Sequence, residues 1–131
     1  MNVRTIKLED HSKLISFWKE NYFVTEMDSL YRFKLFLEKN PGLSLVTEDI
    51  GKIVGTVLGS FDGRRGYLQK LVVDKNYRGQ GIGKNLVDLV VKKLQDLGAL
   101  YIPISCDAKN TPFYKKSGFE KTDQVPMSIS K

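Results

Sequence analysis

The sequence predicts an α/β protein in which a mixed, mostly antiparallel sheet carries helices on both faces. Three strand-like apolar segments, at residues 43–47, 53–61 and 67–73, follow one another with only short turns between them. Such tight connections join antiparallel strands. The long helical pattern of residues 81–97 lies between the third segment and a further strand-like segment at 101–105. A strand–helix–strand unit needs a parallel, right-handed crossover, and this makes the predicted sheet mixed.

The N-terminal part of the chain is typical of one strand followed by two helices. Residues 3–8 alternate between apolar and polar side chains, as a half-buried strand does. Asp10 is a suitable N-cap for a first helix and Ser29 for a second one. The second helix is expected to end at the Asn-Pro-Gly sequence of residues 40–42. The first helix carries apolar side chains at helical spacing, at Leu14, Ile15, Trp18 and Tyr22.

The C-terminal part begins with the strongest helical pattern of the chain, at residues 81–97. Gly98 is a good residue to end this helix. The segments that follow predict a strand at 101–105, a short helix at 111–117 and one or two final strands within 119–130. The apolar side of the long helix is formed by Ile82, Leu86, Leu89, Val90, Leu94 and Leu97.

Length and composition restrict the class of protein. The chain has 131 residues, enough for one domain spanning residues 1–131. The net charge is +6, but basic residues are scattered singly or in pairs, so nucleic acid is not the expected partner and a small polyanion fits as well. No stretch is apolar enough to cross a membrane, and residues 1–4 do not resemble a secretory signal. A cytoplasmic protein is therefore expected, with its single cysteine, Cys106, buried at a strand end.

The most informative segment is the turn from Arg78 to Lys84, between the strand 67–73 and the long helix. Three alternate glycines, Gly79, Gly81 and Gly83, allow tight backbone turns and a close approach to a ligand. The free N–H groups of the first helical turn and the helix dipole attract an anion, and the flanking Arg78 and Lys84 add positive charge. The alternative is a glycine-rich connection that only caps a helix.

Two other phosphate-binding motifs fit the segment less well. A P-loop requires four residues between its first glycine and the Gly-Lys pair, followed by Ser or Thr, whereas Asn85 follows Lys84 here. A Rossmann fingerprint would place a glycine at the position of Lys84. Nucleoside triphosphates and NAD are therefore not favoured, and no His, Cys, Asp and Glu cluster has the spacing of a metal site.

The sequence resembles the GNAT N-acetyltransferases at two motifs. Arg78-x-x-Gly81-x-Gly83, preceded by Leu71-x-Val73, is similar to the motif that binds the pyrophosphate of acetyl-CoA in that family. The segment 110–119, NTPFYKKSGF, is similar to a second family motif. The resemblance implies an acyl-CoA N-acyltransferase fold, splayed at its central strands, that uses acetyl-CoA as co-substrate without a metal. The coenzyme-binding residues that it implies are Leu71, Val72, Val73, Arg78, Gly79, Gln80, Gly81, Ile82, Gly83, Lys84, Asn110, Phe113 and Tyr114.

The resemblance also implies how the chemistry is divided. Tyr114 matches the family tyrosine that faces the coenzyme sulfur, so it is the expected catalytic residue, a general acid for the leaving thiolate. A backbone N–H of Val72 or Val73 is the expected donor to the developing oxyanion. Many relatives carry a glutamate base on the strand before the turn, whereas Gln69 lies near that position here. The carboxylates that the sequence offers as a base are Glu26, Glu48 and Asp107, and none is preferred.

The expected acceptor is a primary amine of a small molecule or a protein. In the family the acceptor pocket lies between the first two helices, here residues 22–29, and at the last hairpin, here 120–127. Glu26 and Asp28 would suit a cationic amine. The missing glutamate also leaves open a non-catalytic acyl-CoA-binding regulatory module, and a homodimer is compatible with the resemblance.

Overall fold

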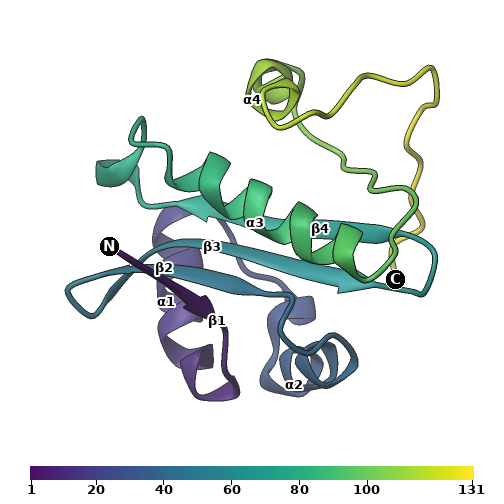
Figure 1. Ribbon diagram of the computed structural model, residues 1–131. Coiled ribbons are helices and arrows are strands. Elements are labelled where there is room, and N and C mark those ends of the chain that lie inside the picture. Colours follow the sequence, from purple (N-terminus) through teal and green to yellow (C-terminus); the bar gives the residue numbers. More distant parts are fainter.

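The computed structural model of the protein describes all 131 residues. Its centre is a four-stranded sheet in the order β1-β2-β3-β4, in which every neighbouring pair is antiparallel. Two helices lie on one face of the sheet, and the longest helix lies on the other (Figure 1). The strands are β1 (Asn2–Thr5), β2 (Leu45–Asp49), β3 (Lys52–Phe61) and β4 (Gly66–Val73), and the helices are α1 (His11–Asn21), α2 (Leu30–Lys39), α3 (Ile82–Asp96) and α4 (Thr111–Lys115).

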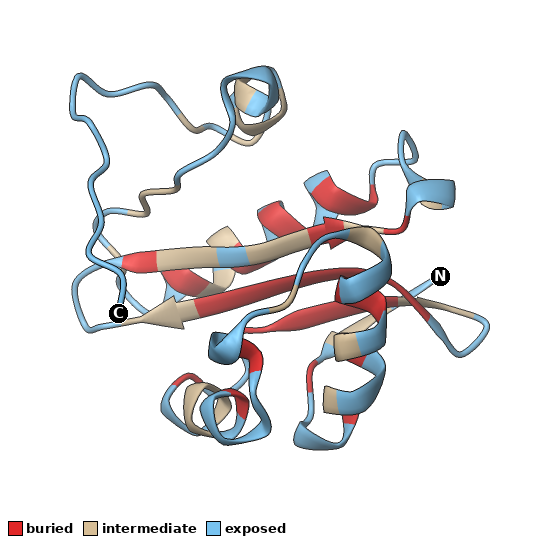
Figure 2. Ribbon diagram, turned by 180° about the vertical axis from the view of Figure 1, so that it is seen from behind, coloured by how far each residue is buried: buried red, intermediate tan, exposed pale blue.

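The core has two halves because the sheet is covered on both faces. The strand β3 is buried along most of its length, since helices pack against it from both sides (Figure 2). Each fully buried aliphatic side chain contributes about 1.5–3 kcal/mol. The half under α1 and α2 is formed by Ile6, Leu14, Phe17, Trp18, Phe33, Val46, Ile53, Leu58 and Val72. The half under α3 is formed by Leu43, Leu45, Val54, Val57, Ile82, Leu86, Val90 and Leu94.

The predicted helices on both faces are confirmed, and so are several of their termini. Ser29 caps α2, with its hydroxyl accepting a hydrogen bond from the Arg32 N–H at 3.3 Å. The long helix ends before Gly98, which has φ +98°, and the Ala99 N–H returns to the Leu94 carbonyl at 3.0 Å. This hydrogen-bond pattern satisfies the last carbonyls of a helix and needs a left-handed residue, here glycine.

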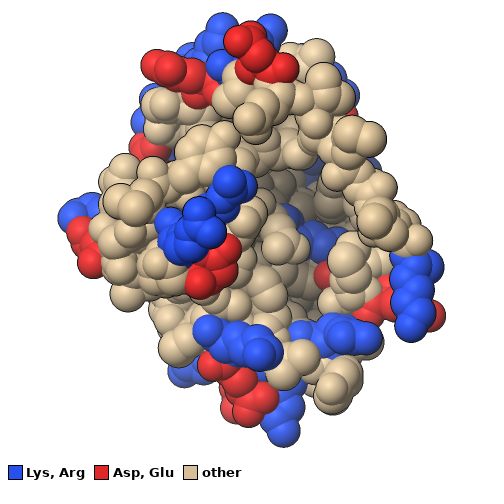
Figure 3. Space-filling view, turned by 90° about the vertical axis from the view of Figure 1, so that its right-hand side faces the viewer, with Lys and Arg blue, Asp and Glu red and all other residues tan.

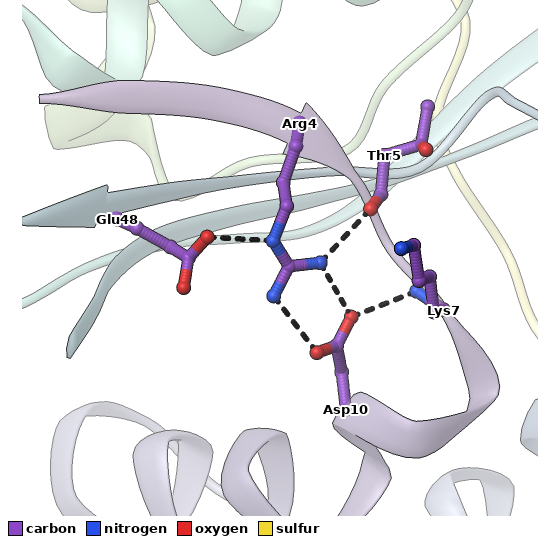
Figure 4. Close-up of polar contacts among 5 residues, drawn as sticks. All are labelled: Arg4, Thr5, Lys7, Asp10 and Glu48. Atoms are coloured by element: carbon purple, nitrogen blue, oxygen red, sulfur yellow. Dashed lines mark hydrogen bonds and ion pairs between the residues drawn. The ribbon is translucent and has the colours of Figure 1, made fainter. Parts of the chain in front are cut away.

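Asp10 differs from its prediction, because its side chain makes no cap hydrogen bond to α1. Instead it accepts two hydrogen bonds from the Arg4 guanidinium, both at 2.8 Å, and one from the Lys7 N–H (Figure 4). The Arg4 Nε atom donates to Glu48 at 2.6 Å. Hydrogen bonding to Arg4 is the main reason why the pKa of Asp10 is lowered. The network fastens β1 both to β2 and to the start of α1.

The strands predicted at 101–105 and within 119–130 do not form. Tyr101 makes a single parallel bridge to Arg65, and the chain then leaves the sheet toward α4 (Figure 1). Pro103 gives a physical reason, because proline has no N–H to donate to a neighbouring strand. The mixed sheet is therefore reduced to an antiparallel sheet with one parallel bridge. Cys106, predicted to be buried at a strand end, is exposed.

Two further properties concern membranes and metals. None of the helices combines the length and the apolar character that crossing a bilayer requires. Nowhere in the chain do three or more His, Cys, Asp or Glu side chains come close enough together to hold a metal ion.

Candidate active site

The turn before α3 presents a row of unpaired backbone N–H groups. Gly79 and Gly81 have φ angles of +82° and +84°, and Gly81 is the N-cap of the helix. The helical hydrogen bonds begin only with the Asn85 N–H, which donates to the Gly81 carbonyl at 3.0 Å. The backbone N–H groups of residues 78–84 donate to no acceptor within the protein. Unpaired donors at a helix N-terminus are the groups that an anion needs, and the anion-binding role that the sequence predicts for this turn stays a prediction.

The three glycines of the turn have two different roles. A β-carbon on Gly79 or Gly81 would point into open space, with no heavy atom within 4 Å, so these positions face the outside of the turn. A β-carbon on Gly83 would lie 3.2 Å from Cζ of Phe113 and 3.4 Å from Cγ2 of Val73. Gly83 therefore allows α4 to pack closely on the first turn of α3, and Phe113 is placed there by this contact.

The charged side chains beside the turn have partners within the protein. Arg78 is exposed, and its Nε atom donates to the Val73 carbonyl at 3.3 Å. This contact directs the guanidinium back along the end of β4. The Lys84 ammonium lies 2.6 Å from the Asp88 carboxylate, one helical turn further along α3. Both interactions are exposed to solvent and therefore weak, so a more highly charged anion can compete for the Arg78 guanidinium and the Lys84 ammonium.

The strand β4 is the edge of the sheet and is irregular at its middle. It pairs with β3 alone, so alternate backbone groups on its outer edge are unpaired beyond the bridge at Arg65. Its register shifts opposite Thr56 and Leu58, and Lys70, inside the irregular stretch, has φ +52°. The Thr56 hydroxyl fixes the bulge by donating to the Lys70 carbonyl at 2.9 Å. Trp18 supports it, because its Nε1–H donates to the same hydroxyl at 3.0 Å.

Tyr114 lies on α4, in an aromatic group above the first turn of α3. Its ring meets Phe113 and Phe119 edge-on, with centroid distances of 5.0 and 5.8 Å. Burial is the main cause that raises the pKa of the Tyr114 hydroxyl, with smaller contributions from Cys106 and Tyr22. A tyrosine with a raised pKa stays protonated at neutral pH and remains able to donate its proton.

A hollow lies on the side where residues 102–131 arch over the body of the protein. Lys and Arg atoms lie inside this hollow and around its rim (Figure 3). The arch exists because the chain leaves the edge of β4 after Tyr101 and returns only beyond α4. A space beside an open strand edge can accept an extended ligand by backbone hydrogen bonds.

None of the three carboxylates that the sequence offered as bases makes a hydrogen bond or an ion pair with β4. Glu48 is bound to Arg4 at the opposite side of the sheet (Figure 4). Glu26 and Asp107 are exposed and have no ion-pair partner. Asp28, which the sequence offered for the acceptor rather than as a base, is paired with Lys70 of β4. The strand β4 itself contains no Asp or Glu, since its sequence is GYLQKLVV. No side-chain base is therefore evident on the strand that leads to the turn.

Of the other predicted coenzyme-binding residues, some are exposed to solvent and some are packed in the core. Gln80 is exposed within the turn, and Asn110 is exposed at the N-cap position of α4, where its side chain makes no cap hydrogen bond. Ile82 is buried in the core, so only its backbone can face a ligand. Leu71 and Val73 pack toward α3, whereas Val72 packs on the opposite face of the sheet, toward α1.

The chain is similar to known acetyltransferases along most of its length. The Acetyltransferase (GNAT) family matches residues 11–119, which include the turn, β4 and α4. An acetyltransferase of Photorhabdus laumondii is 32% identical over 136 aligned residues, covering 100% of this chain and 94% of the relative. The chain therefore belongs to the GNAT acetyltransferase family.

Solved structures show the same fold. A glucosamine-6-phosphate N-acetyltransferase of Arabidopsis thaliana is similar with a TM-score of 0.79 and 24% identity, covering 98% of this chain and 97% of the other. A predicted acetyltransferase of Clostridium acetobutylicum, solved with acetyl-CoA, has a TM-score of 0.78 and 21% identity, with coverage of 98% and 95%. At these identities the likeness establishes the fold, and the predicted α/β class is confirmed.

Proposed function

We propose that the protein transfers an acetyl group from acetyl-CoA directly to a primary amine of a small molecule or a protein. The observation that carries this proposal is the row of unpaired N–H groups of residues 78–84, beside the open edge of β4. The pyrophosphate of the coenzyme fits the N-terminus of α3, where donors and helix dipole act together. The extended pantetheine arm fits the unpaired edge of β4.

The protein offers a group for two of the three needs of the proposed reaction, oxyanion stabilisation and protonation of the thiolate, but none for deprotonation of the amine. The amine nitrogen attacks the acetyl carbonyl carbon, and the carbon–sulfur bond breaks. A backbone N–H at Val72 or Val73 stabilises the carbonyl oxygen as it gains charge. The leaving thiolate takes a proton from Tyr114, whose hydroxyl is protonated at neutral pH. Because β4 carries no carboxylate, the proton of the amine goes to water or is lost before the amine binds.

Acetyl transfer without an acyl-enzyme also accounts for Cys106. Direct transfer requires no nucleophile of the protein, so the exposed thiol has no role in the reaction. The proposed setting is the cytoplasm, where acetyl-CoA is available and a free thiol stays reduced.

A second candidate function is a regulatory module that binds acyl-CoA without turnover. The observation in its favour is the absence of a carboxylate from β4, where Gln69 is exposed. Glutamine cannot accept the proton that a general base must remove.

One experiment separates the two functions. The protein is incubated with acetyl-CoA and a panel containing a peptide N-terminus, a lysine side chain, a polyamine and an amino sugar, and released thiol is measured. Thiol release that depends on one amine supports the transferase. Binding of coenzyme A without thiol release supports the regulatory module. A protein that does not bind coenzyme A contradicts both.

A further inference from the structure

The ammonium group of Lys70, at the bulge of β4, is enclosed by the segment that joins α1 to α2. Its Nζ atom donates to the Phe23 carbonyl at 2.7 Å and lies 3.1 Å from a carboxylate oxygen of Asp28. The same atom lies 5.0, 5.3 and 4.8 Å from the ring centroids of Trp18, Tyr22 and Phe23. Only 12% of the Lys70 side chain is exposed. A lysine so enclosed is unusual, since lysine is almost never buried without partners.

We propose that Lys70 is a positioning residue, which fastens residues 22–28 to the bulge of β4 and so fixes the acceptor side of the active site. The inference rests on the proposed function, in which the coenzyme occupies the outer edge of β4. Residues 22–28 leave the end of α1 and cross the sheet toward α2 (Figure 2). Lys70 is the side chain of β4 that holds this segment by an ion pair and by a hydrogen bond to its backbone.

Asp28 is the ion-pair partner of Lys70 within residues 22–28, and its buried charge depends on that lysine. The residue is 5% exposed, and its carboxylate also accepts the Thr25 N–H at 2.9 Å. Its carbonyl oxygen lies 2.7 Å from Nε2 of His11, which ties the same residue to the start of α1. Loss of the lysine charge would leave a buried carboxylate without its cation, which destabilises the local structure strongly. Asp28 is therefore not free to bind a cationic acceptor, contrary to its expected role.

The segment held by Lys70 carries two half-exposed aromatic rings. Tyr22 and Phe23 are 56% and 50% exposed, and their ring centroids lie 4.1 Å apart with the ring planes tilted by 40°. Lys70 therefore holds two half-exposed rings in a fixed place beside β4. These two rings belong to the segment that Lys70 is proposed to position on the acceptor side of the active site.

The test compares three variants. Lys70→Met keeps the length of the side chain and removes the charge, whereas Lys70→Arg keeps the charge. Lys92→Met is the matched control, because Lys92 pairs with Asp96 on the exposed side of α3, with 75% of its side chain exposed. Trp18 is the single tryptophan and is fully buried beside Lys70, so its fluorescence reports on this place alone.

The expected effects are confined to the surroundings of Lys70 and differ in size among the variants. In Lys70→Met, acrylamide quenching of Trp18 rises about two-fold or more and the KM of the acceptor rises about ten-fold, while the Kd of coenzyme A stays within two-fold. Lys70→Arg recovers most of both effects, and Lys92→Met shows neither. Unchanged quenching and acceptor KM in a folded Lys70→Met overturn the inference. A loss of coenzyme A affinity as large as the rise in the acceptor KM also overturns it, because that pattern indicates general destabilisation.

A second variant keeps the inference testable if Lys70→Met does not fold. Lys70→Met combined with Asp28→Asn removes both charges, so no carboxylate stays buried without a partner. Raised quenching with normal coenzyme A binding in this double variant supports the positioning role, and wild-type quenching contradicts it. The fluorescence and coenzyme measurements need no acceptor. A wild-type protein that acetylates no amine therefore refutes the proposed function, while the quenching still decides the role of Lys70.

Discussion

Replacing Gly81 with alanine separates the anion-binding role of the turn from its contribution to stability. Gly81 has φ +84°, a left-handed conformation that disfavours an L-residue by about 1–2 kcal/mol. No atom of the protein lies within 4 Å of the added β-carbon, so no internal clash increases that penalty. The variant should therefore fold, with its melting temperature lowered by about 3–10 °C, since 1 kcal/mol corresponds to about 3–5 °C for a chain of this length.

The effect on coenzyme A should be larger than the effect on stability. The added methyl group lies on the open side of the turn, where the proposed phosphate meets the N–H groups of residues 78–84. Loss of one charge-assisted hydrogen bond, about 1.5–3 kcal/mol, raises the Kd by about 10- to 150-fold. Isothermal titration of coenzyme A measures this directly.

Gly51→Ala is the matched control for this prediction. Gly51 has φ +74°, and its added β-carbon also meets no atom within 4 Å, but it lies in the turn between β2 and β3. The two variants should lose similar stability, and only Gly81→Ala should lose coenzyme affinity. Equal coenzyme affinity in the two folded variants would refute the assignment of the phosphate turn.

Three further predictions concern charge, proton donation and pH. Arg78→Ala should weaken the binding of coenzyme A by about ten-fold but leave the binding of a pantetheine analogue without phosphates unchanged, because only the phosphates meet the guanidinium. An equal loss of affinity for both ligands would mean that Arg78 acts on folding. Tyr114→Phe should lower kcat at saturating acetyl-CoA by about 10²-fold, the low end for a general acid, with the Kd unchanged, and full turnover would make it a packing residue. Arg4→Met should cost about 2 kcal/mol in urea unfolding at pH 7. Since the pKa of Asp10 is lowered in the folded state, the wild type loses this advantage progressively as the pH falls below about 4, and a difference that does not shrink as the pH is lowered contradicts the assignment.

Much of the fold could be predicted because its signals are local in sequence. The helix α3 and the glycines before it lie within one stretch, and the periodicity and backbone freedom of those residues act over a few positions. The hairpins of β2, β3 and β4 were likewise predicted, with ends displaced by only one or two residues. The prediction of a strand at 101–105 was wrong, because it relied on the apolar residues and disregarded Pro103, which has no N–H to donate to a neighbouring strand.

The carboxylates show the limit of sequence reasoning most clearly. Glu48 and Asp28 are ordinary acidic residues in the sequence, and either could have faced the active site. Their partners, Arg4 and Lys70, are 44 and 42 positions away, so no local pattern could reveal the pairs. Lys70 itself gave only a weak signal, as a lysine beside Gln69 in an otherwise apolar strand.

The sequence by itself determined the family and the glycine-rich turn before α3, because adjacent residues encode both. The tertiary structure alone decided how each glycine and each charge is used. Gly83 became a packing contact only when α4 brought Phe113 against it, whereas Gly81 remained open to solvent. Lys70 has its proposed positioning role only in the folded chain, where three aromatic rings and a carboxylate surround its ammonium group. Such roles depend on which side chains folding removes from water together, and that is a property of the packed chain.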